Sequence, residues 1–270
     1  AFQVWGEAVL RSKAEIRESV WQALTEAGVA IFPGAFGRIP NFVGAAQAAE
    51  RAAQLEAWQR AEVVKCNPDL PQLPLRRRAL QEGKTLYMAV PRLTRPRCFI
   101  ELDPTKVRDY SFASTIKGAF RAGRPVHPGE MRPIDLIVCG SVAVGRDGAR
   151  VGKGGGFSDL EYALLRTMGL VTARTPVLTT VHPLQVLEEP IPMTRHDIVL
   201  DCIATPSGVI TCLPAYPKPE GVYWDEVGPK IDEVPILQEL RQGLKRPAGQ
   251  EPGVVEGTRA RLSPRRHRHV

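Results

Sequence analysis

The sequence predicts an α/β fold built on a mainly parallel sheet with helices on both faces. Strand-like runs alternate with helix-like segments through residues 62–204, and this alternation is typical of parallel strands joined by crossover helices. The run at residues 135–144 is apolar and rich in β-branched side chains, as expected of a strand covered on both faces. In such sheets ligands bind beyond the carboxyl ends of the strands, and a glycine-rich stretch follows this run.

The first predicted element is an amphipathic helix over residues 12–27. Ser12 and Glu15 form a capping box at its start, and Gly28 follows its end. Residues 1–11 are expected to be disordered. The apolar stripe of the helix consists of Ile16, Val20, Trp21 and Leu24.

Lys13 and Arg17 are four residues apart in this helix, so they point from the same face. Like charges at this spacing repel each other, and an anion between them would relieve the repulsion. A solvated helix face is the structural alternative to an anion-binding pair.

The middle of the chain alternates between helix and strand patterns. The helix carrying Arg76, Arg77 and Arg78 presents these side chains in several directions, which indicates a solvated surface. Residues 94–134 are rich in proline and arginine and predict only a short helix near residues 109–119. The elements before that segment are a helix over 43–58, a strand over 62–66, a helix over 73–83 and a strand over 84–90.

Residues 135–165 are predicted to form a strand, a turn, a glycine-rich loop and a helix in succession. The loop at residues 152–156 (GKGGG) places four glycines and one lysine in five positions. Ser158 and Glu161 form a second capping box, which predicts a helix over residues 159–168 with Ser158 as its N-cap. Free backbone N–H groups and the positive end of the helix dipole would meet the loop there, so the sequence predicts an anion site.

The C-terminal third completes the predicted domain. A short helix is expected over residues 235–244, and the folded domain is expected to cover residues 12–234. The remainder of residues 235–270 is rich in proline, glycine and arginine and is predicted to be a largely disordered tail. The strands of this part are expected at 176–181, 199–204 and 209–213.

The net charge of +7 is concentrated at the end of the chain. Five arginines and no acid lie within residues 257–270, which leaves a charge of +2 for residues 1–256. The nearly neutral body argues against a nucleic-acid-binding domain on charge. The basic tail by itself is a candidate RNA-binding segment whose affinity would depend on salt.

The cysteines indicate a reducing environment, so we expect a cytoplasmic protein. They are odd in number and form no CxxC pair, which predicts buried free thiols. No apolar run approaches the roughly 18 residues of a membrane span, so no membrane partner is expected. The chain starts without an initiator Met or a signal-peptide pattern, and we expect it to begin within a longer product. The cysteines are Cys66, Cys98, Cys139, Cys202 and Cys212.

The glycine-rich loop also carries a family resemblance. Residues 150–159 (RVGKGGGFSD) are similar to the RLGRGKGYYD signature of the 5-formyltetrahydrofolate cyclo-ligases, also called methenyltetrahydrofolate synthetases. Lys13 and Arg17 match a lysine and an arginine on the first helix of those enzymes. Residues 90–92 (VPR) match the end of their second strand, and residues 196–201 (HDIVLD) resemble their EHDxxxD segment.

This resemblance implies a three-layer αβα sandwich that binds ATP, Mg²⁺ and 5-formyltetrahydrofolate. In these enzymes ATP phosphorylates the formyl oxygen, N10 attacks the activated carbon, and phosphate leaves to give 5,10-methenyltetrahydrofolate. The implied catalytic residues are Lys153 and Arg150, and the implied Mg²⁺ ligands are Asp159 and Asp197. The implied folate contacts are Lys65, Asp69 and Phe157. The implied ATP-binding residues are Lys13, Arg17, Gly152, Lys153, Gly154, Gly155, Gly156, Phe157 and Ser158.

Departures from the family pattern leave two functional hypotheses open. Gly155 occupies the position of a second loop cation, and Lys65 and Asp69 replace a serine and a glutamate of the folate segment. Such changes are expected to weaken transition-state stabilisation. One hypothesis is a cyclo-ligase-like domain that binds ATP and Mg²⁺, with a reduced folate as a further ligand. The other is a catalytically inactive module of an RNA-binding protein, because an animal branch of the family carries a C-terminal RNA-recognition motif that this sequence lacks.

Overall fold

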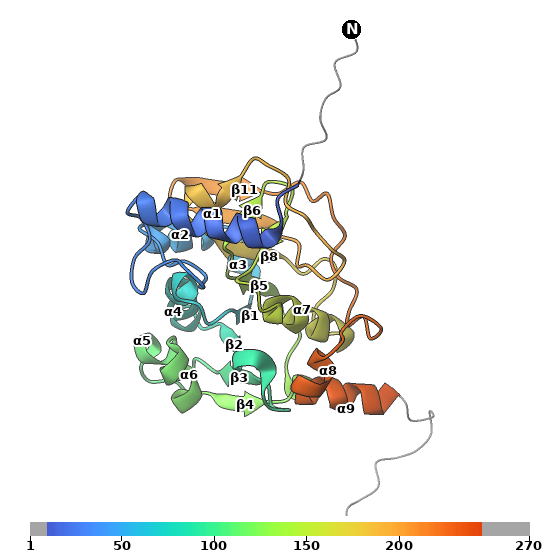
Figure 1. The fold of residues 1–270 in the computed structure, drawn as a ribbon. Coiled ribbons are helices and arrows are strands. Elements are labelled where there is room, and N and C mark those ends of the chain that lie inside the picture. Colours follow the sequence, from blue (N-terminus) through green and yellow to red (C-terminus); the bar gives the residue numbers. More distant parts are fainter. Residues whose placement is uncertain (1–9, 245–270) are drawn as a thin grey trace, which may run out of the picture.

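The computed structural model describes residues 10–244, which form an α/β domain around one large sheet (Figure 1). Five neighbouring strands, from β10 to β2, are parallel, and antiparallel strands complete both edges. The predicted fold class is therefore confirmed. Within the described residues the sheet has the order β11 (Gly208–Thr211), β10 (Cys202–Thr205), β8 (Val177–Thr180), β5 (Leu136–Cys139), β1 (Val63–Cys66), β2 (Thr85–Ala89), β3 (Phe99–Leu102) and β4 (Arg124–Val126).

Helices cover both faces of the sheet, which gives the three-layer αβα sandwich (Figure 1). Successive strand residues face different layers: Val63 of β1 packs into one core, and Val64 packs into the core on the opposite face. The first core lies under α7 (Phe157–Thr167) and α9 (Pro235–Leu244), next to the short α8 (Lys230–Glu233). The second core lies under α2 (Ala45–Ala52), α3 (Glu56–Arg60), α4 (Leu73–Gln81), α5 (Tyr110–Ala113) and α6 (Ile116–Ala122).

A small second sheet follows the carboxyl end of β5. It has the order β7 (Arg150–Val151), β6 (Ala143–Gly145) and β9 (Val186–Leu187). The helix α1 (Lys13–Glu26) packs on it through the predicted apolar stripe. The capping box of Ser12 and Glu15 is present, so the first predicted helix is confirmed. Short 3₁₀ turns connect other elements: η1 (Leu70–Gln72), η2 (Pro91–Leu93), η3 (Pro128–Glu130) and η4 (Pro183–Gln185).

Two predicted elements are each divided in the structure. The strand expected over 135–144 ends at Cys139, and the chain re-forms a strand at Ala143 in the other sheet. Gly140 lies at this break, packed against the side chains of Asp69 and Gln72, where a Cβ would approach both within 3.0 Å. The helix expected over 43–58 is likewise divided into α2 and α3.

The capping box predicted at Ser158 and Glu161 is wrong. Helix α7 begins at Phe157, and its N-cap is Gly156, which has a φ of +66° and provides no side-chain cap. Ser158 lies inside the first turn, where its hydroxyl oxygen accepts a hydrogen bond from Asn67 Nδ2 at 2.6 Å. The glycine allows the left-handed backbone that brings the loop onto the helix.

Long-range packing accounts for the other differences. Arg76 was expected on a solvated surface, but it is buried and donates to the main-chain carbonyls of Asn67, Asp69 and Ser114. The antiparallel strands β3 and β4 lie in residues 94–134, where only a helix was predicted. That helix is present as the pair α5 and α6.

The C-terminal helix was predicted over the correct residues, and it belongs to the folded unit. Ile236 and Leu237 of α9 are buried in the core under α7, so the folded unit extends past residue 234. The expected disorder of residues 1–9 and 245–270, including the basic tail, lies outside the described residues.

The expected free thiols are present. Four of the five cysteines are buried, Cys202 is half-buried, and all are free. Desolvation raises the pKa of the Cys66 thiol to about 11. None of the helices in residues 10–244 combines the length and apolar character that a membrane span requires.

Candidate functional site

The glycine loop leads from β7 directly into α7. Gly154 and Gly156 have positive φ values of 109° and 66°, which favour glycine. No side chain caps the start of α7, so its first backbone N–H groups have no intrahelical partner. This helix start is open to an anionic group, which the helix dipole would also favour.

Arg150 is buried directly behind the loop. Its Nε and Nη2 donate to the carbonyl oxygen of Gly140 at 3.0 and 2.8 Å, and its Nη1 donates to Asp159 Oδ1 at 3.2 Å. The guanidinium therefore joins the chain just beyond β5 to the first turn of α7. Because 3% of the residue is exposed, Arg150 holds the loop in place more than it presents charge to a ligand.

Helix α1 brings its two predicted cations to the loop. Arg17 Nε donates to the carbonyl oxygen of Gly152 at 2.6 Å, and its guanidinium also lies against Gly154. Burial lowers the pKa of Arg17, and the nearby charge of Arg150 adds to the shift. Lys13 Nζ lies 2.6 Å from Asp197 Oδ1. The sequence prediction that both side chains share one face agrees with this arrangement.

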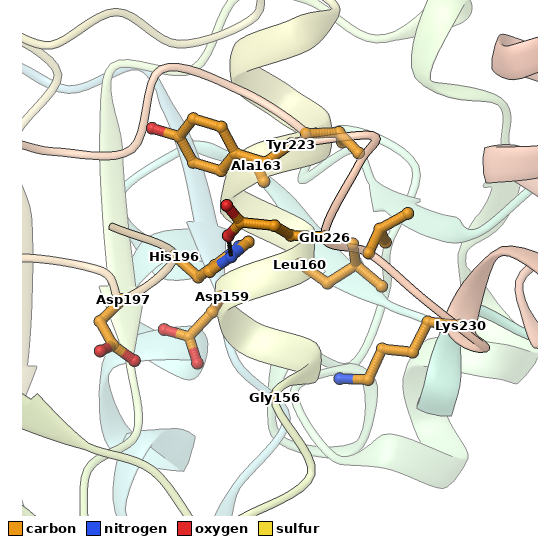
Figure 2. Close-up of a pocket in the computed structure, with 11 residues that line it drawn as sticks. Gly156, Asp159, Leu160, Ala163, His196, Asp197, Tyr223, Glu226 and Lys230 are labelled. Atoms are coloured by element: carbon orange, nitrogen blue, oxygen red, sulfur yellow. Dashed lines mark hydrogen bonds and ion pairs between the residues drawn. The ribbon is translucent and has the colours of Figure 1, made fainter. Parts of the chain in front are cut away.

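Two adjoining cavities lie on either side of the loop. The first cavity has a volume of about 220 Å³ and opens at the carboxyl ends of β1 and β2. The second has a volume of about 270 Å³ and lies between α7, the turn before β10 and the C-terminal segment (Figure 2). Gly156 and Asp159 line both cavities. The start of α7 is thus their common wall.

The first cavity contains most of the predicted loop and substrate residues. Lys153 Nζ lies 3.9 Å from Asp69 Oδ1 across it, and Lys153 is exposed while Asp69 is half-buried. The ring of Phe157 forms part of the wall. Polar and charged residues on the remaining wall include Asn67, Arg92, Arg150, Ser158 and Glu161.

Lys65, which the family resemblance predicts as a substrate contact, is not among the residues that line the two cavities. Its amine is buried, pairs with the Glu161 carboxylate and donates to Asn67 Oδ1 at 2.6 Å. Residues of β1 alternate between the two cores, and this position directs the side chain toward α7. Lys65 therefore supports the cavity wall from behind.

The two predicted metal ligands both point into the second cavity (Figure 2). Asp159 Oδ1 accepts from Arg150 and from the Ile198 N–H at 2.9 Å, while its Oδ2 accepts no hydrogen bond from the described residues. Asp197 uses Oδ1 for Lys13 and Oδ2 for Thr194. No group of three or more potential metal ligands occurs among residues 10–244.

The carboxylates of Asp159 and Asp197 nevertheless fit the way in which proteins bind Mg²⁺. Mg²⁺ is commonly held by one or two carboxylates together with substrate phosphates and water. Asp159, with one free oxygen at the cavity wall, fits that requirement. Asp197 would first have to exchange its contact with Lys13 for the metal.

Arg92 and Lys230 are site residues that the sequence interpretation missed. The Arg92 guanidinium and the Lys230 amine lie 5.6 and 4.9 Å from the centre of the Phe157 ring, so both contribute cation–π contacts to the loop. Arg92 has a φ of +56°, a strained value of the kind found near functional sites. The residues 90–92 that resembled the family strand end were a signal for Arg92, whereas no local pattern marks Lys230.

Comparisons with known proteins identify the family of this chain. Residues 9–206 match the family model described as the 5-formyltetrahydrofolate cyclo-ligase family. The methenyltetrahydrofolate synthase domain-containing protein of Bos taurus is 38% identical over 255 residues, which cover 92% of this chain and 67% of that protein. The Mus musculus protein of the same name is 40% identical over 246 residues, which cover 89% of this chain and 66% of that protein. This chain thus spans about two thirds of the length of those relatives.

Among solved structures, the NMR structure of Aquifex aeolicus 5,10-methenyltetrahydrofolate synthetase is similar to this chain. The two share 20% sequence identity with a TM-score of 0.48, over 78% of this chain and 98% of that one.

Proposed function

The chain belongs to the 5-formyltetrahydrofolate cyclo-ligase family, and on that premise we propose that it converts 5-formyltetrahydrofolate to 5,10-methenyltetrahydrofolate while ATP becomes ADP and phosphate. The observation that carries this proposal is the pair of cavities that share Gly156 and Asp159 at the start of α7. Two ligands bound on either side of that wall would have their reactive groups adjacent. The second cavity would hold the nucleotide phosphates, and the first would hold the folate.

The start of α7 supports binding of the phosphates. Its uncapped backbone N–H groups and the glycines of the loop let a phosphate approach the main chain. Arg17 and Lys13 bring positive charge to the same loop from α1. Phosphoryl transfer depends mainly on positioning and on such cations and donors around the developing charge.

Mg²⁺ would be held by Asp159, with Asp197 as a second ligand once it releases Lys13. When bound there, the metal would supply positive charge that offsets part of the charge of the nucleotide phosphates. In the chain itself, Arg150 holds the Asp159 carboxylate in place through Oδ1 and leaves Oδ2 available. Lys13 would then be free to contact a phosphate oxygen.

The first cavity supports binding of a flat, partly apolar ligand such as a folate. Ile39, Ile116 and the ring of Phe157 provide apolar wall, and Asp69 and Glu161 provide acceptors. Arg92 at the rim could pair with the carboxylates of the glutamate end of a folate. This distribution of a few polar groups in an apolar wall is typical of small-molecule sites.

Lys153 and Arg150 take different roles in this proposal. Lys153 is exposed in the first cavity, so its amine could contact the phosphoryl group as it moves to the formyl oxygen. Arg150 is buried and acts through Gly140 and Asp159, so we assign it as a positioning residue. In the transfer, the formyl oxygen gains the phosphoryl group and ADP leaves; N10 then attacks the same carbon, loses its proton, and phosphate departs.

The decisive test measures ADP release by the purified chain with Mg-ATP, with and without 5-formyltetrahydrofolate, together with the absorbance of the methenyl product. We expect ADP only when the folate is present. Lys153→Ala should lower the turnover rate by about 10²–10³, the usual effect of losing one transition-state donor. Lys106→Ala is the matched control, because Lys106 is exposed and its one ion pair within the described part of the chain is with Asp103 in its own turn.

Ligand-dependent stabilisation of the fold separates the remaining outcomes, since a ligand stabilises the native state according to its affinity. Thermal stabilisation by Mg-ATP and by the folate without ADP release would indicate an inactive binding module. Full activity of Lys153→Ala, or ADP release that ignores the folate, would contradict the proposed reaction.

A further inference from the structure

The second cavity is completed by a segment outside the family-matched residues. Residues 9–206 match the family model, whereas Val222, Tyr223, Glu226, Val227 and Lys230 all line this cavity. We call residues 222–230 the C-terminal strap. The strap supplies about half of the cavity wall, so the site of this chain depends on residues beyond those that the family model matches.

The strap is held firmly against the rest of the site. The Val222 N–H donates to Thr167 Oγ1 at 2.9 Å, which fixes the strap to the end of α7. Glu226 pairs with Arg195 and with His196, two residues of the turn that also carries Asp197. The contact between Glu226 and His196 is visible in Figure 2. The Arg195 guanidinium lies 4.0 Å from the centre of the Tyr223 ring. These contacts determine where the following helix α8 begins.

Lys230, the first residue of α8, reaches the glycine loop. Its Nζ donates to the carbonyl oxygen of Gly155 at 2.8 Å. A Cβ on Gly156 would lie 2.6 Å from that Nζ, so the amine occupies the space that a loop side chain would need. The loop has no side chain at residues 154–156, and the strap provides a cation at that place.

No carboxylate among residues 10–244 forms an ion pair with Lys230, because those around the second cavity have other partners. Asp197 pairs with Lys13, and Asp159 pairs with Arg150. Glu226 pairs with Arg195 and His196. Lys230 is the sole lysine or arginine among the described residues lining this cavity, and its hydrogen bond to a neutral carbonyl uses one of its three donors.

Burial also disfavours the charged form of the Lys230 amine. Burial lowers the pKa of Lys230, and the charges of Asp159 and Glu233 oppose that shift. A half-buried amine that lacks an acidic partner is stabilised when an anionic ligand arrives. The remaining two N–H donors of Lys230 are available for such a ligand.

We propose that Lys230 binds the phosphate groups of the nucleotide in the second cavity, as the cation that the glycine loop itself does not carry on that side. This inference rests on the proposed nucleotide binding and adds a residue to it. The strap would then be part of the nucleotide site, and the loop glycines would be needed both for close approach of a phosphate and for space around the Lys230 amine.

The test is calorimetric titration of the whole chain with Mg-ATP, Mg-tripolyphosphate and adenosine. Lys230→Met removes the charge but keeps the length of the side chain, and Lys230→Arg keeps the charge. Lys106→Met is the control for loss of an exposed lysine. We expect Lys230→Met to weaken binding of Mg-ATP and Mg-tripolyphosphate by about 10- to 100-fold, as for a hydrogen bond to a charged group. Adenosine binding should be unchanged, and Lys230→Arg should retain most of the affinity.

Each outcome decides something different. Binding of both phosphate probes by Lys230→Met with the parent affinity would overturn the role of Lys230 but leave nucleotide binding intact. Equal weakening of adenosine would show a packing effect and would also overturn it. No binding of Mg-ATP by the parent chain would refute the proposed function itself, and the role of Lys230 with it.

A second measurement covers the case in which Lys230→Met unfolds. Reductive methylation of the parent chain, read by peptide mass spectrometry, should be slower at Lys230 when Mg-tripolyphosphate is bound. Lys106 serves as the internal reference, because it is exposed and is not among the residues that line either cavity. Equal methylation of Lys230 with and without the probe would contradict phosphate contact.

Discussion

Replacing Lys65 by Met would leave the Glu161 carboxylate without its partner between β1 and α7. The exposed fractions of the two side chains are 2% for Lys65 and 8% for Glu161. The lysine amine also donates to Asn67, whose amide in turn holds the Ser158 hydroxyl at the start of α7. The substitution therefore removes the central donor of a buried network, while the Met side chain refills most of its volume.

The expected cost follows from this burial. Removing one partner of a buried ion pair destabilises a protein by about 3–5 kcal/mol, because the other charge stays buried without compensation. Glu161 also borders the first cavity, where water can reach it, so we expect a value near the lower end, about 3 kcal/mol. For a domain of this size that corresponds to a decrease in Tm of roughly 6–12 °C.

Urea unfolding monitored by circular dichroism gives the free energy of unfolding of the parent, Lys65→Met, Glu161→Met and the double variant. Replacing both partners by apolar residues of similar volume should recover most of the loss, since such exchanges are often neutral or stabilising. The double-mutant cycle then isolates the coupling between the two side chains.

One result would refute this reasoning directly. The free energy of unfolding of Lys65→Met could lie within about 1 kcal/mol of the parent value while the variant binds 5-formyltetrahydrofolate more weakly. That result would show that Lys65 contacts the substrate, as the family resemblance implies. A double variant no more stable than Lys65→Met would likewise show that no buried pair exists.

Three further predictions address the loop, its support and the buried thiols. Gly156→Ala should weaken the binding of Mg-ATP measured by calorimetry, because the added Cβ would meet the Lys230 amine. The control is Gly169→Ala, since Gly169 has a similar φ of +70° but open space around its Cβ position. Equal weakening of Mg-ATP binding by the two substitutions would contradict this prediction. Arg150→Met should lower the free energy of unfolding by about 2–4 kcal/mol, since a carbonyl and a carboxylate lose their donor, and a parent-like urea midpoint would disprove that support. In the folded state the pKa of the Cys66 thiol is raised from 9.0 to about 11, so the unfolded thiol loses its proton at lower pH and the free energy of unfolding falls as pH rises between these values. Cys66→Ala should reduce the slope of the free energy of unfolding against pH by about 1.4 kcal/mol per pH unit. An unchanged slope would rule the thiol out as its source.

The sequence by itself determined the features whose signals lie close together along the chain. The capping box of Ser12 and Glu15 and the apolar stripe behind it lie within four turns of one helix, so their spacing was sufficient to predict α1. The alternation of strand and helix patterns determined the fold class for the same reason. The glycine loop and the helix after it were also predicted from consecutive residues, although the N-cap of α7 is Gly156 and not Ser158.

Only the tertiary structure decided which partner each buried polar group takes. Lys65 pairs with a residue 96 positions away, and Lys230 bonds to the loop across 75 positions. Arg76 is buried because carbonyls from two separate segments, residues 67–69 and Ser114, converge on it. A buried charge must be hydrogen-bonded or paired, but periodicity along the chain does not specify which distant segment supplies the partner. The partner of each buried charge depends on how α7, the sheet and the C-terminal strap pack together. The same packing determines which cations support the glycine loop and which face its cavities.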